Sequence, residues 1–277
     1  MNSVFCKSRG VKLACNKIFG CLKRIFNFKN LFTIHNSQFT KSIAFTLAET
    51  LIVMGIIGVV AALTLPNLNS STGDREKVAK VKKIYQNLTD AFGRAQAVYG
   101  PFDEWFINDG DDNKKATKRF AERMIEFMKI SKDCGLTQNV CISNTMTDGG
   151  STSNISDMLG TENYYSYILS DGTSVAFGKD NSSNRGNILV DIDGNTKGQN
   201  DPGNDVFGFF INTENLQLLP YGTGYVDIID LYSNEHINAT TWILQHENLD
   251  YLKLNSNGTC KNNPSITLDG VTNTTCK

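Results

Sequence analysis

Residues 45–65 read FTLAETLIVMGIIGVVAALTL, a run whose single formal charge is that of Glu49. As a helix, a run of this length extends about 31 Å, at about 1.5 Å per residue, which matches the hydrocarbon core of a bilayer. A buried helix of a soluble protein is the alternative, but such a helix would seldom follow a long segment without acidic residues. The run therefore predicts a transmembrane helix that ends near Pro66.

The charges are distributed unevenly on either side of this run. Residues 1–44 carry eight Lys and Arg side chains and no acid, whereas the rest of the chain carries 19 basic and 28 acidic side chains. By the positive-inside rule, the basic segment stays in the cytoplasm and the residues after Pro66 are exported. The sequence thus predicts a single-pass membrane protein with a cytoplasmic N-terminus. The net charge of -1 gives no sign of nucleic-acid binding.

The residues at the start of the apolar run carry a likeness to a known family. Residues 44–53 (AFTLAETLIV) and 55–63 (GIIGVVAAL) resemble the prepilin signature of type IV pilins and type II secretion pseudopilins. In that family, a membrane peptidase removes a leader and the new amino-terminal residue is methylated. The resemblance implies cleavage by a prepilin peptidase between Ala44 and Phe45, and methylation of Phe45. It also implies that the chain lies in the lipid of the bacterial inner membrane. The chain departs from the family in having Ala before the cut, where Gly is usual, and in its longer leader.

Glu49 is a carboxylate within an apolar segment, where an ionised group costs at least ~2.5 kcal/mol and needs a partner. Cleavage would create one, because the free amine of Phe45 in one subunit could pair with Glu49 of a neighbouring subunit. Such a pair would fix the axial stagger of a helical filament. The alternative is an acid that reaches the membrane surface by itself. With the surrounding motif, the assembly role is the favoured interpretation.

The pattern beyond residue 66 predicts an α+β head on a helical stem. Apolar residues spaced three and four apart over residues 77–99 form one stripe, which a sheet would cover, and Gly100 with Pro101 ends the helix. A free coiled coil is the alternative for this stripe. A second amphipathic helix is expected over residues 116–130. Five strands are expected, with a turn at Asp171 and Gly172, over residues 164–169, 173–177, 187–192, 206–211 and 216–219.

The predicted fold class is α+β, with a long N-terminal transmembrane and amphipathic helix packed on a small antiparallel sheet, as in pilins. Within the head, residues 142–160 are rich in small polar residues and predict a surface loop. Residues 225–277 show no clean period, so their secondary structure is left open. The expected domains are a basic cytoplasmic leader, the transmembrane helix, an amphipathic stem helix and an exported globular head, at residues 1–44, 45–66, 67–100 and 101–277.

Three of the seven cysteines belong to the leader, and the other four belong to the exported head. Four cysteines in an oxidising compartment predict two disulfides, for which three pairings exist. The local pairings, Cys134 with Cys141 and Cys260 with Cys276, are preferred to the crossed ones. Neither pair has the spacing of a zinc site, and the histidines offer no ligand pattern.

A run of oxygen-bearing side chains at residues 191–205 is the main candidate for a ligand site. Asp191 and Asp193 point to one side at a strand end. A Gly-rich turn could bring further oxygens to them, from Asn195, Asp201, Asn204 or Asp205. A hard cation such as calcium needs a set of oxygen ligands, but the run does not follow the EF-hand pattern. Calcium binding and an ordinary Asx-rich turn are both left open.

The sequence predicts a structural protein and not an enzyme, because it has no Gly-rich phosphate loop and no nucleophile elbow with a suitable His partner. The expected function is that of a pilin or pseudopilin, which polymerises with its own copies or with other pilin-like subunits. The product would be a type IV pilus-like or type II secretion filament. The alternative is a monomeric membrane-tethered protein whose head binds a ligand or surface outside the cytoplasm. Processing of the leader distinguishes the two.

Overall fold

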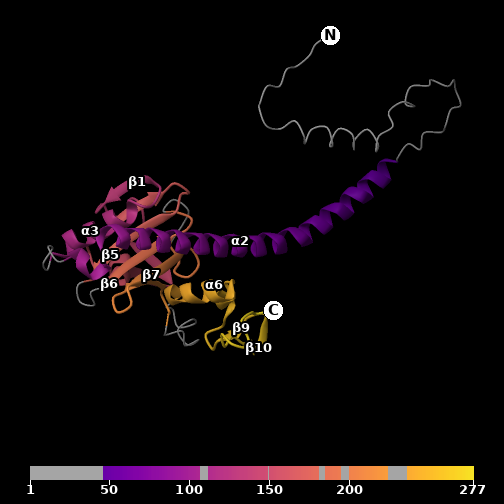
Figure 1. The fold of residues 1–277 in the computed structure, drawn as a ribbon. Helices are drawn as coiled ribbons and strands as arrows, with labels where there is room; N and C mark the ends of the chain where they lie inside the picture. Colours follow the sequence, from indigo (N-terminus) through magenta and orange to yellow (C-terminus); the bar gives the residue numbers. More distant parts are fainter. Residues whose placement is uncertain (1–45, 107–111, 149, 181–184, 195–199, 224–235) are drawn as a thin grey trace, which may run out of the picture. The chain divides into compact units, whose positions relative to one another are not determined.

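The computed structural model describes residues 46–106, 112–148, 150–180, 185–194, 200–223 and 236–277, without the side chains of residues 62–71. The predicted leader, residues 1–44, lies outside the described residues. The chain divides into two compact units, Met1–Val59 and Val60–Lys277. Helix α2, Leu47–Tyr99, contributes residues to both units (Figure 1).

The second unit is an α+β fold around a six-stranded antiparallel sheet in the order β1-β4-β5-β6-β7-β8. From β4 to β8, each strand pairs with the next one along the chain, and β1 pairs with β4 at one edge. Antiparallel strands that follow one another along the chain can pair in this way without a crossover connection. The strands are β1 (Ile130–Gly135), β4 (Tyr165–Leu169), β5 (Ser174–Asp180), β6 (Arg185–Asp191), β7 (Val206–Asn212) and β8 (Gln217–Pro220).

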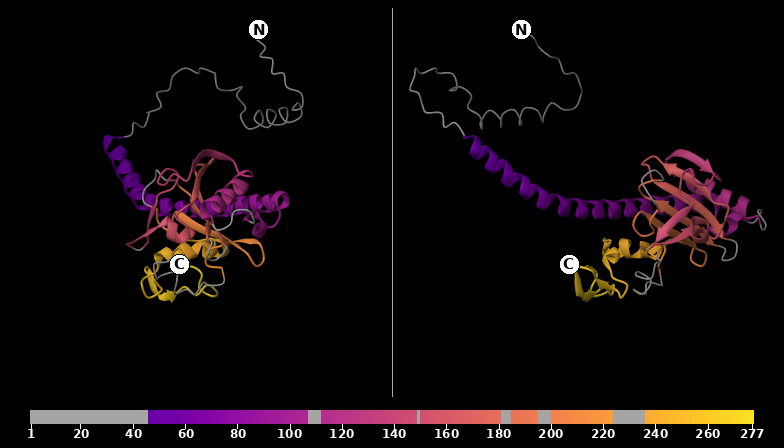
Figure 2. Two further views of the ribbon diagram at one scale, coloured as in Figure 1. Left: turned by 90° about the vertical axis from the view of Figure 1, so that its left-hand side faces the viewer. Right: turned by 180° about the vertical axis from the view of Figure 1, so that it is seen from behind.

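One face of the sheet is covered by the second half of α2, by the 3-10 helix η2 (Phe102–Phe106) and by helix α3 (Asn113–Ile125). The views in Figure 2 show α2 running along the sheet. Alternate strand residues point into this core, because successive side chains of a strand face opposite sides. Those on this side include Phe177, Ile188 and Phe209.

The other face of the sheet packs against a smaller layer. The layer consists of the hairpin of β2 (Thr145–Asp148) and β3 (Ser151–Asn154) and the short helix α4 (Ile155–Leu159). Ala176 of β5 and Leu189 of β6 belong to this second core. The sheet is therefore buried on both faces over its central strands.

The C-terminal region, left open by the sequence, forms short elements that pack beside the sheet. They are η3 (His236–Ala239), α6 (Thr240–His246), η4 (Asp250–Lys253) and the paired strands β9 (Thr259–Cys260) and β10 (Asn263–Thr267). Trp242 and Tyr251 from this region are buried in the same core as α2. Elements of two to seven residues are too short to show a hydrophobic period.

The predicted apolar stripe over residues 77–99 is confirmed. Val81, Leu88 and Ala95 are completely buried, and Tyr85 stacks on Phe209 of β7 with ring centroids 5.7 Å apart. The sheet covers this stripe, as expected, so the coiled-coil alternative is wrong. The helix ends at Tyr99, and Gly100 adopts a φ of +80°, a conformation that favours glycine.

The predicted fold class is wrong in two respects. First, the sheet is not small, because it has six strands and includes β1, which the sequence did not reveal. Second, no helix in the described part of the chain is long and apolar enough to cross a membrane, which corrects the predicted transmembrane helix. Helix α2 is long but mixed in character: residues 47–61 are mostly apolar, and charged residues occur from Asp74 to Lys77.

Two further predictions need correction. The second helix begins three residues earlier than predicted and ends at Ile125. Its start is set by Asp112, whose side chain accepts from the backbone N–H groups of Lys114 and Lys115 at 3.1 and 3.2 Å. The loop predicted at residues 142–160 instead contains β2, β3 and α4. Its small polar residues form strand pairs and cap α4, whose Asn154 N–H donates to Asp157 at 3.3 Å.

Candidate functional site

The start of α2 is defined by Thr46 and Glu49. The Thr46 N–H and hydroxyl donate to Glu49 Oε2 at 2.8 and 2.9 Å, and the Glu49 N–H donates to Thr46 Oγ1 at 3.3 Å. This reciprocal arrangement is a capping box, which satisfies backbone donors at the first turn of a helix. The Glu49 side chain therefore caps the first turn of its own helix. The predicted cleavage and methylation residues, Ala44 and Phe45, lie outside the described residues.

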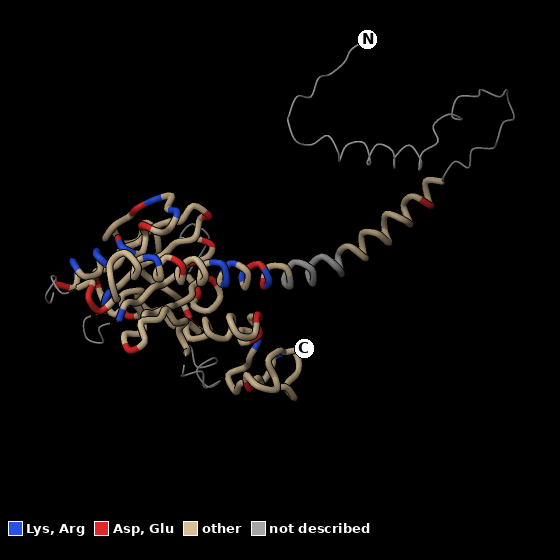
Figure 3. The backbone as a smooth tube through the Cα atoms, in the orientation of Figure 1, with Lys and Arg blue, Asp and Glu red and all other residues tan. Residues whose placement is uncertain are grey.

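The first turns of α2 present an exposed apolar surface. Within the described residues 46–61, Glu49 is the one charged residue (Figure 3). The large apolar side chains here are each more than half exposed, and an exposed surface of this size marks an interaction site. We call these residues the apolar segment: Leu47, Leu51, Ile52, Val53, Met54, Ile56, Ile57, Val59 and Val60.

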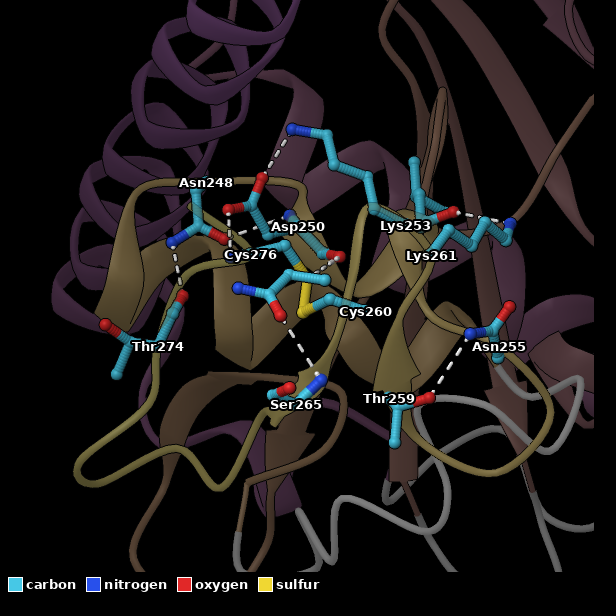
Figure 4. Close-up of a disulfide and its surroundings, with 12 residues drawn as sticks. Asn248, Asp250, Lys253, Asn255, Thr259, Cys260, Lys261, Ser265, Thr274 and Cys276 are labelled. Atoms are coloured by element: carbon cyan, nitrogen blue, oxygen red, sulfur yellow. Dashed lines mark hydrogen bonds and ion pairs between the residues drawn. A yellow bond between two sulfur atoms is a disulfide. The ribbon is translucent and has the colours of Figure 1, made fainter.

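The C-terminal region is closed by a disulfide between Cys260 and Cys276, and its surroundings are shown in Figure 4. The buried Asp250 carboxylate accepts from the Cys276 N–H at 2.8 Å and from Lys253 Nζ at 2.5 Å. Asn248 Nδ2 donates to the Thr274 carbonyl at 3.0 Å. These bonds hold the last residues of the chain against η4.

The same region contacts α2 through charged side chains. Lys82 of α2 pairs with Glu247 at 2.5 Å, and Lys253 lies 3.8 Å from Asp74 of α2. These pairs are partly exposed, so each adds little to the free energy of unfolding. Together they fix the position of the disulfide-bonded region relative to α2.

The second disulfide joins Cys134, near the end of β1, to Cys141, seven residues later. Both disulfides follow the local pairing that the sequence favours over the crossed ones.

The oxygen-rich run at residues 191–205 lies where β6 ends and β7 begins. Asp191 Oδ1 accepts from the N–H groups of Asp193 and Gly194 at 3.1 and 2.8 Å. Asp205 Oδ1 accepts from the Asp201 N–H at 2.6 Å, and its backbone carbonyl accepts from the Ile192 N–H at 2.9 Å. The loop thus brings Asp191 and Asp205 to the same end of the sheet, and both carboxylates cap backbone groups.

A calcium site is not assembled by the described part of this run. Among the described residues, no group of three or more His, Cys, Asp or Glu side chains is placed to hold a metal ion. Asn195, one of the predicted ligands, lies outside the described residues. The hydrogen bonds of Asp191, Asp201 and Asp205 are those of an Asx-rich turn.

Burial changes the acidity of two of these carboxyl groups. It raises the pKa of Asp191 to about 7, against the opposing effect of the Gly194 N–H, and it raises the pKa of Asp205 to about 6. Asp191 is completely buried, and its Oδ2 has no hydrogen-bond partner among the described residues. The ionised form is disfavoured first because burial removes water from the carboxylate, and also because the nearby Asp193 carboxyl raises the pKa further.

We expect the unfolding free energy to fall as pH rises from ~4 to ~7, by up to ~1.4 kcal/mol per pH unit from Asp191 alone. The unfolded carboxyl ionises near its ordinary pKa, whereas the folded one retains its proton up to a pH of about 7. Asp191→Asn keeps an acceptor for the two N–H groups and should flatten this slope, as measured by urea unfolding at several pH values. Asp90→Asn, on the exposed face of α2, is the matched control and should leave the slope unchanged. An unchanged slope in Asp191→Asn would contradict the expectation.

A polar network beside this turn was not foreseen from the sequence. Lys77 of α2 donates to Asn204 Oδ1. Asp148 of β2 contacts the His236 ring through Oδ1 and accepts from the His236 N–H at 2.9 Å through Oδ2. These partners lie far apart in the sequence and share no motif, so no local signal could have paired them.

Comparison with known proteins gives no relative. No family model, curated protein or solved structure matches the chain. The functional proposal therefore depends on the contacts described above and on the resemblance of residues 44–63 to the prepilin signature.

Proposed function

We propose that this chain is a pilin-like or pseudopilin-like structural subunit, which polymerises through the apolar segment at the start of α2. The exposure of that segment is the observation that carries the proposal. Its nine large apolar side chains are each at least 53% exposed, and burying them against another molecule is favourable. Every copy of the chain offers the same segment, and a head-to-tail contact, in which different faces of the segment meet, would continue from copy to copy as a helical filament.

The backbone of the segment can approach a neighbouring helix closely. Gly55 and Gly58 lie three positions apart in this segment, and a Cβ added at either would meet nothing within 4 Å. Small residues on a helix surface let two helices approach each other closely, which favours helix association. The segment therefore combines a large apolar area with points of close contact.

In this proposal, Glu49 fixes the axial stagger between neighbouring subunits of the filament. It is the one charge within the described residues 46–61, and an unpaired carboxylate in an apolar interface is costly. A prepilin peptidase would cut between Ala44 and Phe45 and release an amine four residues before Glu49. The amine of one subunit would then pair with Glu49 of the next, while the two disulfide-bonded loops of the head lie in an oxidising compartment.

Replacement of Glu49 with Gln tests this role. Gln retains the capping box, because its side-chain oxygen still accepts from Thr46, so the change removes the charge and leaves the helix start intact. We expect full-length Glu49→Gln to be trimmed to Phe45 but to be lost from sheared filaments in cells with an active prepilin peptidase and assembly machinery. Mass spectrometry of the N-terminal peptide and immunoblots of the filament fraction measure the two steps.

Glu76→Gln is the matched control, because Glu76 lies on the same helix and pairs locally with Lys80 at 3.0 Å. It should assemble like the wild-type chain. If the wild-type chain keeps residues 1–44 in these cells, or if Glu49→Gln enters filaments as the wild type does, the polymer proposal is wrong. Retention of the leader would favour the monomeric tethered binding protein.

A further inference from the structure

A cavity of about 470 Å³ lies on the face of the sheet opposite α2. Asn187 of β6 pairs with Phe210 of β7, and both line the cavity, whereas their neighbours Ile188 and Phe209 point toward α2. The pleat of the strands therefore directs alternate residues into the cavity. Its walls come from α4 and from the segment that follows β8.

Two glycines make room for this cavity's walls. A Cβ added at Gly208 of β7 would lie 2.4 Å from the Tyr221 ring, so this ring rests directly on the strand backbone. A Cβ at Gly178 of β5 would lie 2.8 Å from the Leu159 side chain of α4. Any larger residue at these positions would push the walls away from the sheet.

The side chains that line the cavity are held in place by the protein itself. The Arg185 guanidinium lies 4.0 Å from the centroid of the Phe210 ring. Asn187 Nδ2 donates to the Leu159 carbonyl at 3.0 Å, and the Tyr221 hydroxyl donates to the Met158 carbonyl at 2.8 Å. A site whose groups are already oriented loses little conformational entropy on binding a ligand.

The cavity lining combines hydrogen-bond acceptors, hydrogen-bond donors and apolar surfaces. Asp157 and Asp180 contribute carboxylates, Arg185 a guanidinium, Asn187 and Asn238 amides and Thr223 a hydroxyl, beside the aromatic rings of Phe210 and Tyr221. We infer that this cavity binds a neutral saccharide. The ring hydroxyls of a saccharide can donate to the carboxylates and accept from Arg185 and the amides, and its C–H faces can pack on the aromatic rings.

The charge of the described lining disfavours an anionic ligand. It contains two carboxylates and one guanidinium, so a phosphate or another anion would meet a net negative charge. An organic cation is the competing ligand class, and the experiment below includes one for comparison.

Ligand-observed saturation-transfer NMR on the full chain tests the inference. The probes are the methyl glycosides of glucose, galactose, mannose and N-acetylglucosamine, each at millimolar concentration, with putrescine as the cationic comparison. We expect saturation transfer to at least one glycoside. Arg185→Gln and Asp180→Asn should each weaken its binding about tenfold, the usual effect of losing a charged hydrogen bond. Lys118→Gln, on the surface of α3, is the matched control and should bind like the wild type.

Thermal unfolding of each variant shows that it is folded. Arg185 is exposed and Asp180→Asn is isosteric, so both variants should melt within a few degrees of the wild type. The inference is overturned if none of the four glycosides shows transfer. It is also overturned if transfer persists undiminished in both variants, or if putrescine alone shows transfer.

Discussion

Leu88→Ala is expected to lower the free energy of unfolding by about 2–5 kcal/mol, the largest effect that we expect from a single substitution. Leu88 lies in the buried stripe of α2, with none of its side chain exposed, and it belongs to the core between α2 and the sheet. Its truncation removes apolar contacts and leaves a cavity that the surrounding aromatic rings can only partly fill.

Leu51→Ala is the matched control on the same helix. Leu51 is 64% exposed in the apolar segment, so its truncation should change the free energy of unfolding by less than ~0.5 kcal/mol. Urea unfolding of the full-length variants, followed by tryptophan fluorescence, measures both effects. The two tryptophans of the chain, Trp105 and Trp242, are buried in the second unit and report its unfolding. Equal effects of the two substitutions would contradict the division of α2 into a buried and an exposed half.

The second large effect is expected on removing the disulfide between Cys260 and Cys276 by replacing both residues with Ser. The disulfide closes a loop with a sequence separation of 16, for which loop entropy alone predicts about 3 kcal/mol of lost stability. The loss should exceed this value, because the released tail also gives up the bond between the Cys276 N–H and the buried Asp250. Asp250 keeps its contact with Lys253, but its other buried oxygen loses a donor, which adds to the cost.

The double Ser variant of Cys134 and Cys141 is the control for this prediction. That pair has a sequence separation of seven, so its loop entropy is smaller, and its removal should cost about 2–3 kcal/mol. Thermal unfolding of both variants without reductant measures the difference. Added reductant should lower the melting temperature of the wild-type chain and change that of each variant less. The same melting temperature for the wild type and the Cys260/Cys276 variant would show that the tail is held without its disulfide.

Much of the sheet could be predicted because β4 to β8 are apolar strands separated by strong turn signals. Strand β1 could not be predicted, because it is an edge strand: of its residues Ile130–Gly135, four are exposed, and Ser, Lys and Asp interrupt any alternation. Its place in the sheet is decided by pairing with β4, which is distant in the sequence. Edge strands often lack a sequence signature for this reason.

The sequence predicts only those features of the candidate site whose residues lie close together in the chain. The capping box of Thr46 and Glu49 has the spacing of a recognised helix-start motif, so a reading of the helix signals alone could have found it. The sequence also placed Asp191 and Asp205 at one turn, which they share. It could not show that their oxygens would be taken up by backbone N–H groups, since this depends on the path of the loop.

The position of α2 within the second unit has a mechanical consequence. The buried half of the helix lies along the sheet and is tied to it and to the C-terminal region by the pairs of Lys83 with Asp171 at 2.6 Å and Lys82 with Glu247. A tensile force on the helix would load its contacts with the sheet together, in shear, and would not peel them apart one at a time. The covalent closure of the tail between Cys260 and Cys276 keeps that end of the fold from unravelling under the same force.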